Sequence, residues 1–218
     1  MSSNSFGGPC YYAPAGGEIY QGTPKVPPRI FLGDVCMEAR KFTPEELSSL
    51  LKQGVSWLQQ QRAHFLPFSV PLDQEQKTHL GPFFSGEILD RARIADASQS
   101  GQTIPYPPFY ETVRAGGERV VPDAAHLSAV AFIDVIVFNR QPTLRTIFHN
   151  LVHVTQFALL GEERVFRGYF ETLNEVGLWM VVPYEEQAYQ MDARFTRDPT
   201  DVFSVEAEIQ EWARQGRY

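Results

Sequence analysis

The 218-residue sequence has a mass of 24.7 kDa, and its composition of 43% hydrophobic and 21% charged residues is typical of a soluble globular domain. The formal net charge is −7 and the pI is about 5.3. This acidic balance, without any run of Lys or Arg, argues against nucleic acid and anionic membrane as partners, because both bind through basic patches.

The first 40 residues are rich in proline and glycine, which predicts an extended arm ahead of a single domain over residues 41–218. The arm begins without the basic and apolar regions of a signal peptide. No apolar stretch in the chain reaches the roughly 18 residues that a membrane span needs. We therefore expect a cytoplasmic protein that binds a small-molecule or peptide substrate.

The N-terminal half of the domain predicts one long helix and scattered short elements. Thr43-Pro44-Glu45-Glu46 is a strong helix start, and apolar residues at three- and four-residue steps extend the helix to about residue 63. Prolines predict a loop over 65–82. A short helix over 85–89 and a short strand over 91–95 come next. Residues 98–126 predict a long loop, with a hairpin turning at Gly116-Gly117.

The C-terminal half predicts one buried strand and then a series of helices. Residues 127–138 are apolar on both faces of a two-residue period, which indicates a strand inside a sheet. A helix capped by Thr143 and ended by Gly161 comes after it. Further helices are expected over 162–172 and 183–195, and a last one along Val202, Val205, Ile209 and Trp212. This order predicts an α+β fold.

The run His149-Asn150-Leu151-Val152-His153 carries the clearest chemical signal. Histidines four apart on a helix share one face, so both can reach one metal ion. With five histidines in 218 residues, chance gives roughly 0.1 such pairs. The surrounding helix is apolar, and buried imidazoles need partners. A shared metal ion would satisfy both; hydrogen bonds to core carbonyls or carboxylates are the alternative.

A two-histidine site needs a third protein ligand. The downstream histidine of metzincins is absent, because Gln156 and Leu159 occupy the relevant positions. The helix that opens at Pro183 offers Glu185 and Glu186. We favour Glu185, which shares a helix face with Ala188, Tyr189 and Asp192; Glu186 stays the alternative.

Residues 148–157, then Leu160-Gly161, then Pro183-Tyr184-Glu185 and Ala188-Tyr189 resemble uncharacterised bacterial zincin-like (gluzincin-type) proteins, which carry F-H-E-L-V-H-V-x-Q-[YF] followed by P-x-E-x-x-A-Y. The resemblance covers about residues 127–196. It implies a zincin-like fold, with a metal-binding helix packed on a small twisted sheet, and a zinc metallohydrolase site with His149, His153 and Glu185 as ligands.

Asn150 stands where that motif has its catalytic glutamate, and an amide cannot act as a general base. We therefore expect the site to be impaired as a peptidase, with Asn150 holding water and Tyr189 donating to a developing oxyanion. His126, Glu162 and Glu186 are other groups that could take over the missing role.

Two other functions stay open. Two His and one carboxylate also form the ligand set of non-heme Fe(II) oxygenases, whose chemistry does not require the motif glutamate. A non-catalytic pseudoenzyme or metal-stabilised binding protein is the third possibility.

Overall fold

The structure is a computed structural model that describes residues 41–115, 127–177 and 181–218, without the side chains of residues 99, 100 and 114. The chain divides into two units, Met1–Cys36 and Met37–Tyr218, and all the described residues lie in the second. The expected N-terminal arm and the expected hairpin at Gly116-Gly117 lie outside the described residues. Every described helix and strand belongs to the second unit.

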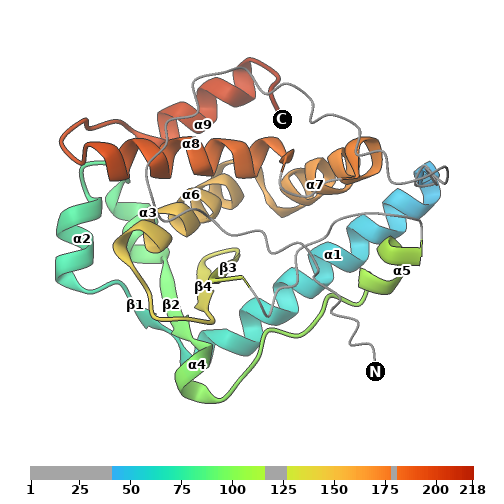
Figure 1. The fold of residues 1–218 in the computed structure, drawn as a ribbon, viewed down its shortest axis with the longest axis horizontal. Coiled ribbons are helices and arrows are strands. Elements are labelled where there is room, and N and C mark those ends of the chain that lie inside the picture. The colour runs from blue at the N-terminus through green and yellow to red at the C-terminus, as the bar shows by residue number, and fades with distance from the viewer. Residues whose placement is uncertain (1–40, 116–126, 178–180) are drawn as a thin grey trace, which may run out of the picture. The chain divides into compact units, whose positions relative to one another are not determined.

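A mixed four-stranded sheet has the strand order β1-β2-β4-β3 (Figure 1). Its strands are β1 (Val70–Pro71), β2 (Arg93–Asp96), β3 (Ala129–Phe132) and β4 (Val135–Phe138). β2 and β4 are parallel, in a register that pairs Ile94 with Ile136. The two outer pairs, β1 with β2 and β3 with β4, are antiparallel.

The long helices begin at the capping residues that the sequence indicates. α1 (Pro44–Phe65) has the capping box of Thr43 and Glu46. α6 (Leu144–Leu160) is capped by Thr143 and ends at Gly161, whose φ is 81°. The series continues with α7 (Glu162–Val176), α8 (Pro183–Arg197) and α9 (Val205–Arg214). The described part of the domain is therefore α+β, as expected.

Three predictions of local structure were wrong: two expected loops contain helices or strands, and one expected strand is a hairpin. The expected loop over 65–82 holds the 3-10 helix η1 (Leu66–Phe68), β1 and α2 (Gln74–Leu80). α2 begins with a capping box of Asp73 and Gln76. The expected loop over 98–126 contains α5 (Tyr110–Ala115), and α4 (Ala97–Ser100) overlaps its start. The short helix and strand over 85–95 are present, as α3 (Gly86–Arg91) and β2.

The single strand expected over 127–138 is instead the hairpin of β3 and β4. Its turn places Ile133 at a φ of 63°, which a β-branched residue rarely adopts. Asp134 is buried beside it and accepts two hydrogen bonds from Arg62, at 2.5 and 2.8 Å. This partly buried ion pair holds the turn, which the apolar pattern does not reveal.

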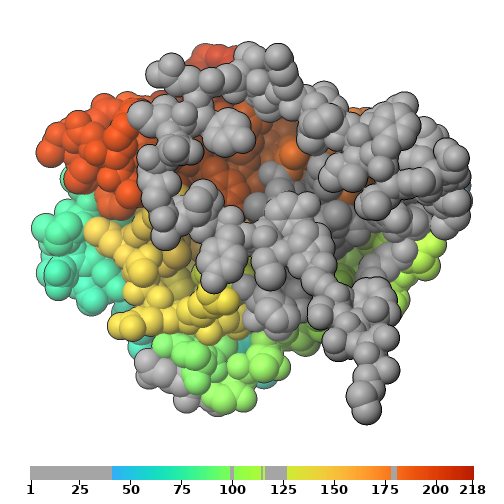
Figure 2. Space-filling model, viewed as in Figure 1, coloured from blue at the N-terminus to red at the C-terminus, as the bar shows by residue number. Residues whose placement is uncertain are grey.

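α6 is the central helix of the domain. Its middle turns are buried on all sides, because it packs against β3 and β4 and also contacts α7, α8 and α9. Figure 1 shows α6 between the sheet and α8. In the space-filling view, yellow atoms of the part of the chain that leads into the first turns of α6 reach the surface beside the end of α8 (Figure 2); β4 itself is buried. The helix with the two histidines is thus held in place from several directions.

No helix among the described residues is both long enough and apolar enough to cross a lipid bilayer.

Gly54 allows α1 and α7 to approach closely. A Cβ at this position would lie 2.5 Å from a ring carbon of Phe166 and 3.0 Å from one of Phe170, and both rings are buried. Overpacking a core costs about 1–3 kcal/mol, while Gly to Ala in a helix gains at most about 1 kcal/mol. We expect Gly54→Ala to lower the free energy of unfolding by about 1–2 kcal/mol in urea denaturation. Gly86→Ala, where the added Cβ meets nothing within 4 Å, is the matched control and should not destabilise the protein.

Candidate metal centre

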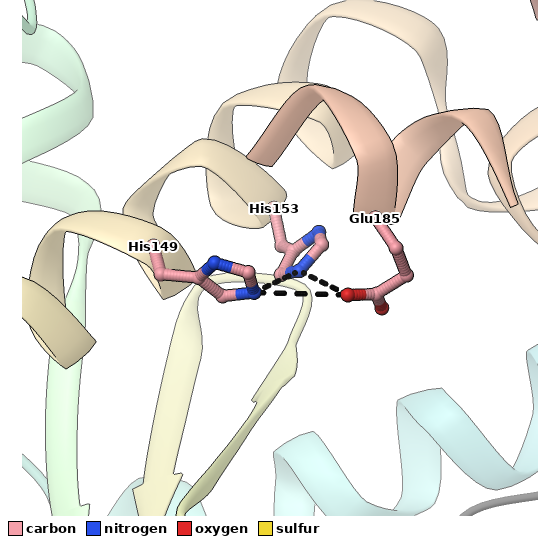
Figure 3. Close-up of side chains that lie close together, drawn as sticks. All are labelled: His149, His153 and Glu185. Atoms are coloured by element: carbon pink, nitrogen blue, oxygen red, sulfur yellow. Dashed lines mark hydrogen bonds and ion pairs between the residues drawn. The ribbon is translucent and has the colours of Figure 1, made fainter. Parts of the chain in front are cut away.

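Three ligand atoms from two helices converge on one point. His149 and His153 lie one turn apart on the face of α6 that packs on α8, and Glu185 lies in the first turn of α8. Ala188 is fully buried, and its small side chain suits the close approach of the two helices. Figure 3 shows both imidazoles and the carboxylate pointing toward one another. The structure therefore brings together the three residues that the sequence indicates as ligands.

The distances between these atoms suit a single ion. The two Nε2 atoms lie 3.2 Å apart, and Glu185 Oε2 lies 3.7 Å from His149 Nε2 and 3.5 Å from His153 Nε2. A point about 2.1 Å from all three atoms lies just outside the plane of this triangle, and zinc binds nitrogen and carboxylate oxygen at about 2.0–2.2 Å. Tetrahedral bonds of about 2.1 Å place ligand atoms about 3.4 Å apart, against about 3.0 Å for adjacent octahedral ligands. The triangle is closer to the tetrahedral value.

The far side of the His149 ring is held by a carboxylate. His149 Nδ1 lies 3.0 Å from Asp192 Oδ2, and Arg145 donates to the other oxygen of Asp192 at 3.0 Å. Asp192 is 3% exposed, and its charge is paired with the guanidinium. An ionised carboxylate only accepts, so Nδ1 carries the hydrogen. His149 Nε2 is then the atom that faces the centre, and metal-binding histidines typically have this arrangement.

The far side of the His153 ring is held by a neutral amide. His153 Nδ1 lies 2.9 Å from Gln156 Oε1. Gln156 is fully buried and its Nε2 donates to the backbone oxygen of Tyr184 at 3.1 Å. The amide nitrogen is thereby committed to an acceptor, so the amide oxygen must face the ring. His153 also carries its hydrogen on Nδ1 and presents Nε2 to the centre.

A buried phenol orients the carboxylate. The Tyr169 hydroxyl donates to Glu185 Oε1 at 2.7 Å, and Tyr169 is 7% exposed. Burial raises the pKa of Tyr169 well above its usual value, and the neighbouring carboxylate raises it further. The hydroxyl therefore stays protonated and holds Oε1, while Oε2 faces the two imidazoles.

The electrostatics of this cluster favour a positive charge at its centre. Burial raises the pKa of Glu185, but the charges and hydrogen bonds of His153 and His149 outweigh burial and hold it well below its usual value. Burial lowers the pKa of His149, but the hydrogen bonds with Asp192 and Glu185 outweigh it and raise that pKa to about 9. Without a metal, a proton on His149 supplies the positive charge; a bound cation would replace that proton.

Of the two residues expected to take part in catalysis, Tyr189 contacts His149 and Asn150 bonds to its own helix. Asn150 is buried and its Nδ2 donates to the backbone oxygen of Thr146 at 2.8 Å, so the amide is anchored to its own helix. The Tyr189 ring lies 4.6 Å from the His149 ring and is 43% exposed. Burial raises the pKa of Tyr189 to about 12, with Glu185 and Asp192 adding to the effect. Tyr189 can therefore donate a hydrogen bond at neutral pH but cannot act as a base.

The other acidic candidates have partners elsewhere. Glu186 accepts from Gln190 on the exposed side of α8, at 2.9 Å, and is not in the cluster. Glu162 accepts from Gln59 of α1, at 2.6 Å. His126 lies outside the described residues.

Three residues that orient the candidate ligands had no role predicted from the sequence. Asp192 is seven residues after Glu185 and therefore shares its helix face. This spacing is the one sign in the sequence that Asp192 lies near the centre. Gln156 comes three residues after His153, which places the two side chains on adjacent turns. Tyr169 comes from α7, and nothing in the sequence links it to Glu185.

We expect Asp192→Asn to weaken zinc binding by about 10–100-fold, because partners that orient ligand histidines typically contribute this much to metal affinity. The Kd is measured by competition with a chelating dye. Asp201→Asn is the matched control, since Asp201 also pairs with an arginine, Arg194, at 2.7 Å, but not with a ligand. Equal zinc affinity of Asp192→Asn and wild type would show that Asp192 does not support the ligand.

The metal-free protein should lose stability between about pH 6.5 and pH 9. The pKa of His149 is raised to about 9 in the folded chain from about 6.5 in the unfolded chain. Its contribution is fully present below pH 6.5 and is lost as the pH rises through 9, on the order of 3 kcal/mol. Urea denaturation in the presence of EDTA at several pH values measures the slope. His149→Gln should flatten it, and an equally steep slope in that variant would assign the effect to another group.

No protein-family model, no curated protein and no solved structure matches this chain.

Proposed function

We propose that the protein binds one divalent transition metal ion, zinc, through His149, His153 and Glu185, and that it is a metal-dependent enzyme of zincin descent. One observation carries this proposal. Three Lewis-basic atoms lie 3.2 to 3.7 Å apart, and both imidazoles have their Nδ1 hydrogens directed away from that point. Such an arrangement needs a positive charge between the atoms, which a proton on His149 supplies in the metal-free chain and a bound cation would supply instead.

Zinc is the metal that this proposal names rather than ferrous iron. The same ligand set serves non-heme iron oxygenases, which stay the alternative enzyme class. The resemblance of residues 127–196 to zincin-like proteins favours zinc.

The proposed chemistry is hydrolytic and limited by proton transfer. A zinc ion held there supplies Lewis-acid chemistry by polarising a carbonyl and lowering the pKa of a coordinated water. Tyr189 is protonated and half-exposed beside His149, so it can donate to a developing oxyanion. In the described part of the chain, the carboxylates that contact the imidazoles are Glu185 and Asp192. The first would hold the ion and the second holds His149, so neither is available as a general base.

The anchoring of Asn150 favours a second candidate function, a metal-stabilised binding protein without catalysis. An amide that donates to a helix carbonyl contributes to packing and does not shuttle protons. A positioned general base is typically worth about 10²–10⁴ in rate. If the protein is an enzyme, the missing general base predicts weak hydrolysis of activated esters and very slow hydrolysis of peptides.

Assays of zinc-loaded protein on p-nitrophenyl acetate and on casein test this proposal. We expect ester hydrolysis that disappears with a chelator and returns with zinc, and casein cleavage about 10²–10⁴-fold below that of ordinary zinc peptidases. Zinc binding with no ester hydrolysis would favour the non-catalytic function. Protein that purifies anaerobically with iron and consumes dioxygen with 2-oxo acids would favour the oxygenase. Casein cleavage at ordinary peptidase rates would show that hydrolysis does not need a carboxylate at position 150.

A further inference from the structure

Two glutamines form a buried polar network behind His153. Gln156 of α6 and Gln187 of α8 are 0% and 1% exposed, and Gln156 Nε2 donates to Gln187 Oε1 at 3.0 Å. Buried amides are costly unless their hydrogen bonds are satisfied. The bonds that these two amides make therefore fix the direction in which each one points.

The network continues to Tyr218. The Tyr218 hydroxyl donates to Gln187 Oε1, the same oxygen that Gln156 contacts, and Gln187 Nε2 donates to the backbone oxygen of Glu208 at 3.4 Å. The Tyr218 ring is held by stacking on Tyr184, with centroids 4.6 Å apart and planes at 7°. Tyr184 in turn supplies the backbone oxygen that Gln156 Nε2 contacts.

Each contact disfavours a reversed Gln156 amide. If this amide turned by 180°, its oxygen would face two acceptors, the backbone oxygen of Tyr184 and Gln187 Oε1. Its nitrogen would then donate toward His153 Nδ1, and that ring would have to move its hydrogen to Nε2. An imidazole with its hydrogen on Nε2 cannot offer that atom to a metal ion. The direction of one buried amide thus decides whether His153 can be a ligand.

We propose that Gln187 and Tyr218 are positioning residues of the metal centre: through Gln156 they keep the His153 hydrogen on Nδ1 and its Nε2 free for the cation. The role in metal affinity rests on the proposed function, while the effect on the His153 tautomer exists without metal. The relay runs from the C-terminal Tyr218, through Gln187 of α8, to a ligand on α6. Changes around Tyr218 should therefore alter the zinc affinity of a site that Tyr218 does not touch.

Three variants test this inference. Gln187→Met keeps the volume of the side chain and removes both its donor and its acceptor. Tyr218→Phe keeps the stacked ring and removes the hydroxyl. Tyr184→Phe is the matched control, because it removes a hydroxyl from the same aromatic stack. The Tyr184 hydroxyl donates to the backbone oxygen of Arg164 and takes no part in the network.

Two readouts report on the ligand rather than on overall stability. Nitrogen-15 NMR of the imidazoles in the metal-free protein at about pH 10, where His149 no longer donates a proton to His153 Nε2, reports the tautomer of His153. Competition with a chelating dye gives the zinc Kd. In Gln187→Met we expect a mixed His153 tautomer and zinc binding weakened about tenfold, the lower end of the usual effect of such partners. Tyr218→Phe should weaken it about threefold, as expected for one neutral hydrogen bond further away. Tyr184→Phe should leave the tautomer and the Kd as in wild type.

The outcomes separate the two proposals. A pure Nδ1-H tautomer together with an unchanged Kd in Gln187→Met would overturn the positioning role. Equal weakening in Tyr184→Phe and Tyr218→Phe would assign the effect to the aromatic stack and would also overturn it. Wild-type protein that binds no zinc, while Gln187→Met still shows the mixed tautomer, would reject the metal centre and leave the positioning of His153 intact.

Discussion

His149→Ala should abolish stoichiometric zinc binding, whereas the wild-type chain should hold close to one zinc ion. Structural zinc sites are worth about 10–16 kcal/mol over four ligands, or roughly 3 kcal/mol for each ligand. Loss of one imidazole should therefore weaken zinc binding by about a hundredfold or more. Elemental analysis of protein purified without a histidine tag gives the stoichiometry, and dye competition gives the Kd.

His79→Ala is the matched control for this experiment. The His79 ring is exposed on α2 and contacts the backbone oxygen of Glu75 in its own helix, so its loss should leave zinc binding unchanged. If both variants keep one tightly bound zinc ion, the histidines of α6 are not the ligands.

Asn150→Glu should raise the rate of zinc-dependent hydrolysis by about 10²–10⁴-fold, the usual contribution of a positioned general base. Asn150 donates to the backbone oxygen of Thr146, a bond that an ionised glutamate cannot make. The new carboxylate would therefore be driven away from that carbonyl. Initial rates on p-nitrophenyl acetate and on a peptide library, measured at saturating zinc, show the gain.

Asn150→Gln separates charge from length in this experiment. It has the reach of glutamate without its basicity, and it should stay at the wild-type rate. A similar gain in both variants would attribute the activity to altered packing. No gain in Asn150→Glu, with zinc binding intact, would contradict the view that the missing carboxylate is what limits hydrolysis.

The long helices were predictable because their boundaries are determined by local chemistry. Thr43 and Thr143 cap their helices through their own hydroxyls, and Gly161 ends α6 at a positive φ. The same logic would have found α2, whose Asp73 and Gln76 form a capping box. That signal was outweighed by the nearby prolines.

The β3–β4 hairpin could not be predicted in the same way. The apolar run over residues 127–138 continues through the turn, and Ile133 is an unusual residue for a φ of 63°. What stabilises the turn is Arg62 of α1, 72 residues from Asp134 in the sequence. Local patterns do not contain such a contact.

In the candidate site, too, local patterns predict some residues and tertiary contacts reveal the others. Helical periodicity places His149 and His153 on one face, and it ranks Glu185 ahead of Glu186. The groups that orient these ligands come from packing between helices: Tyr169 of α7 on Glu185, and Asp192 of α8 on His149. Periodicity can show which residues share a face, but only the tertiary structure shows what that face meets.

The proposed function depends on a cation between two helices, and anomalous diffraction from crystals grown with zinc tests it most directly. At the zinc absorption edge we expect one strong peak about 2.0–2.2 Å from His149 Nε2, His153 Nε2 and a Glu185 carboxylate oxygen. Density without such a peak at full zinc saturation, or a peak bound by other residues, would contradict the proposed metal centre.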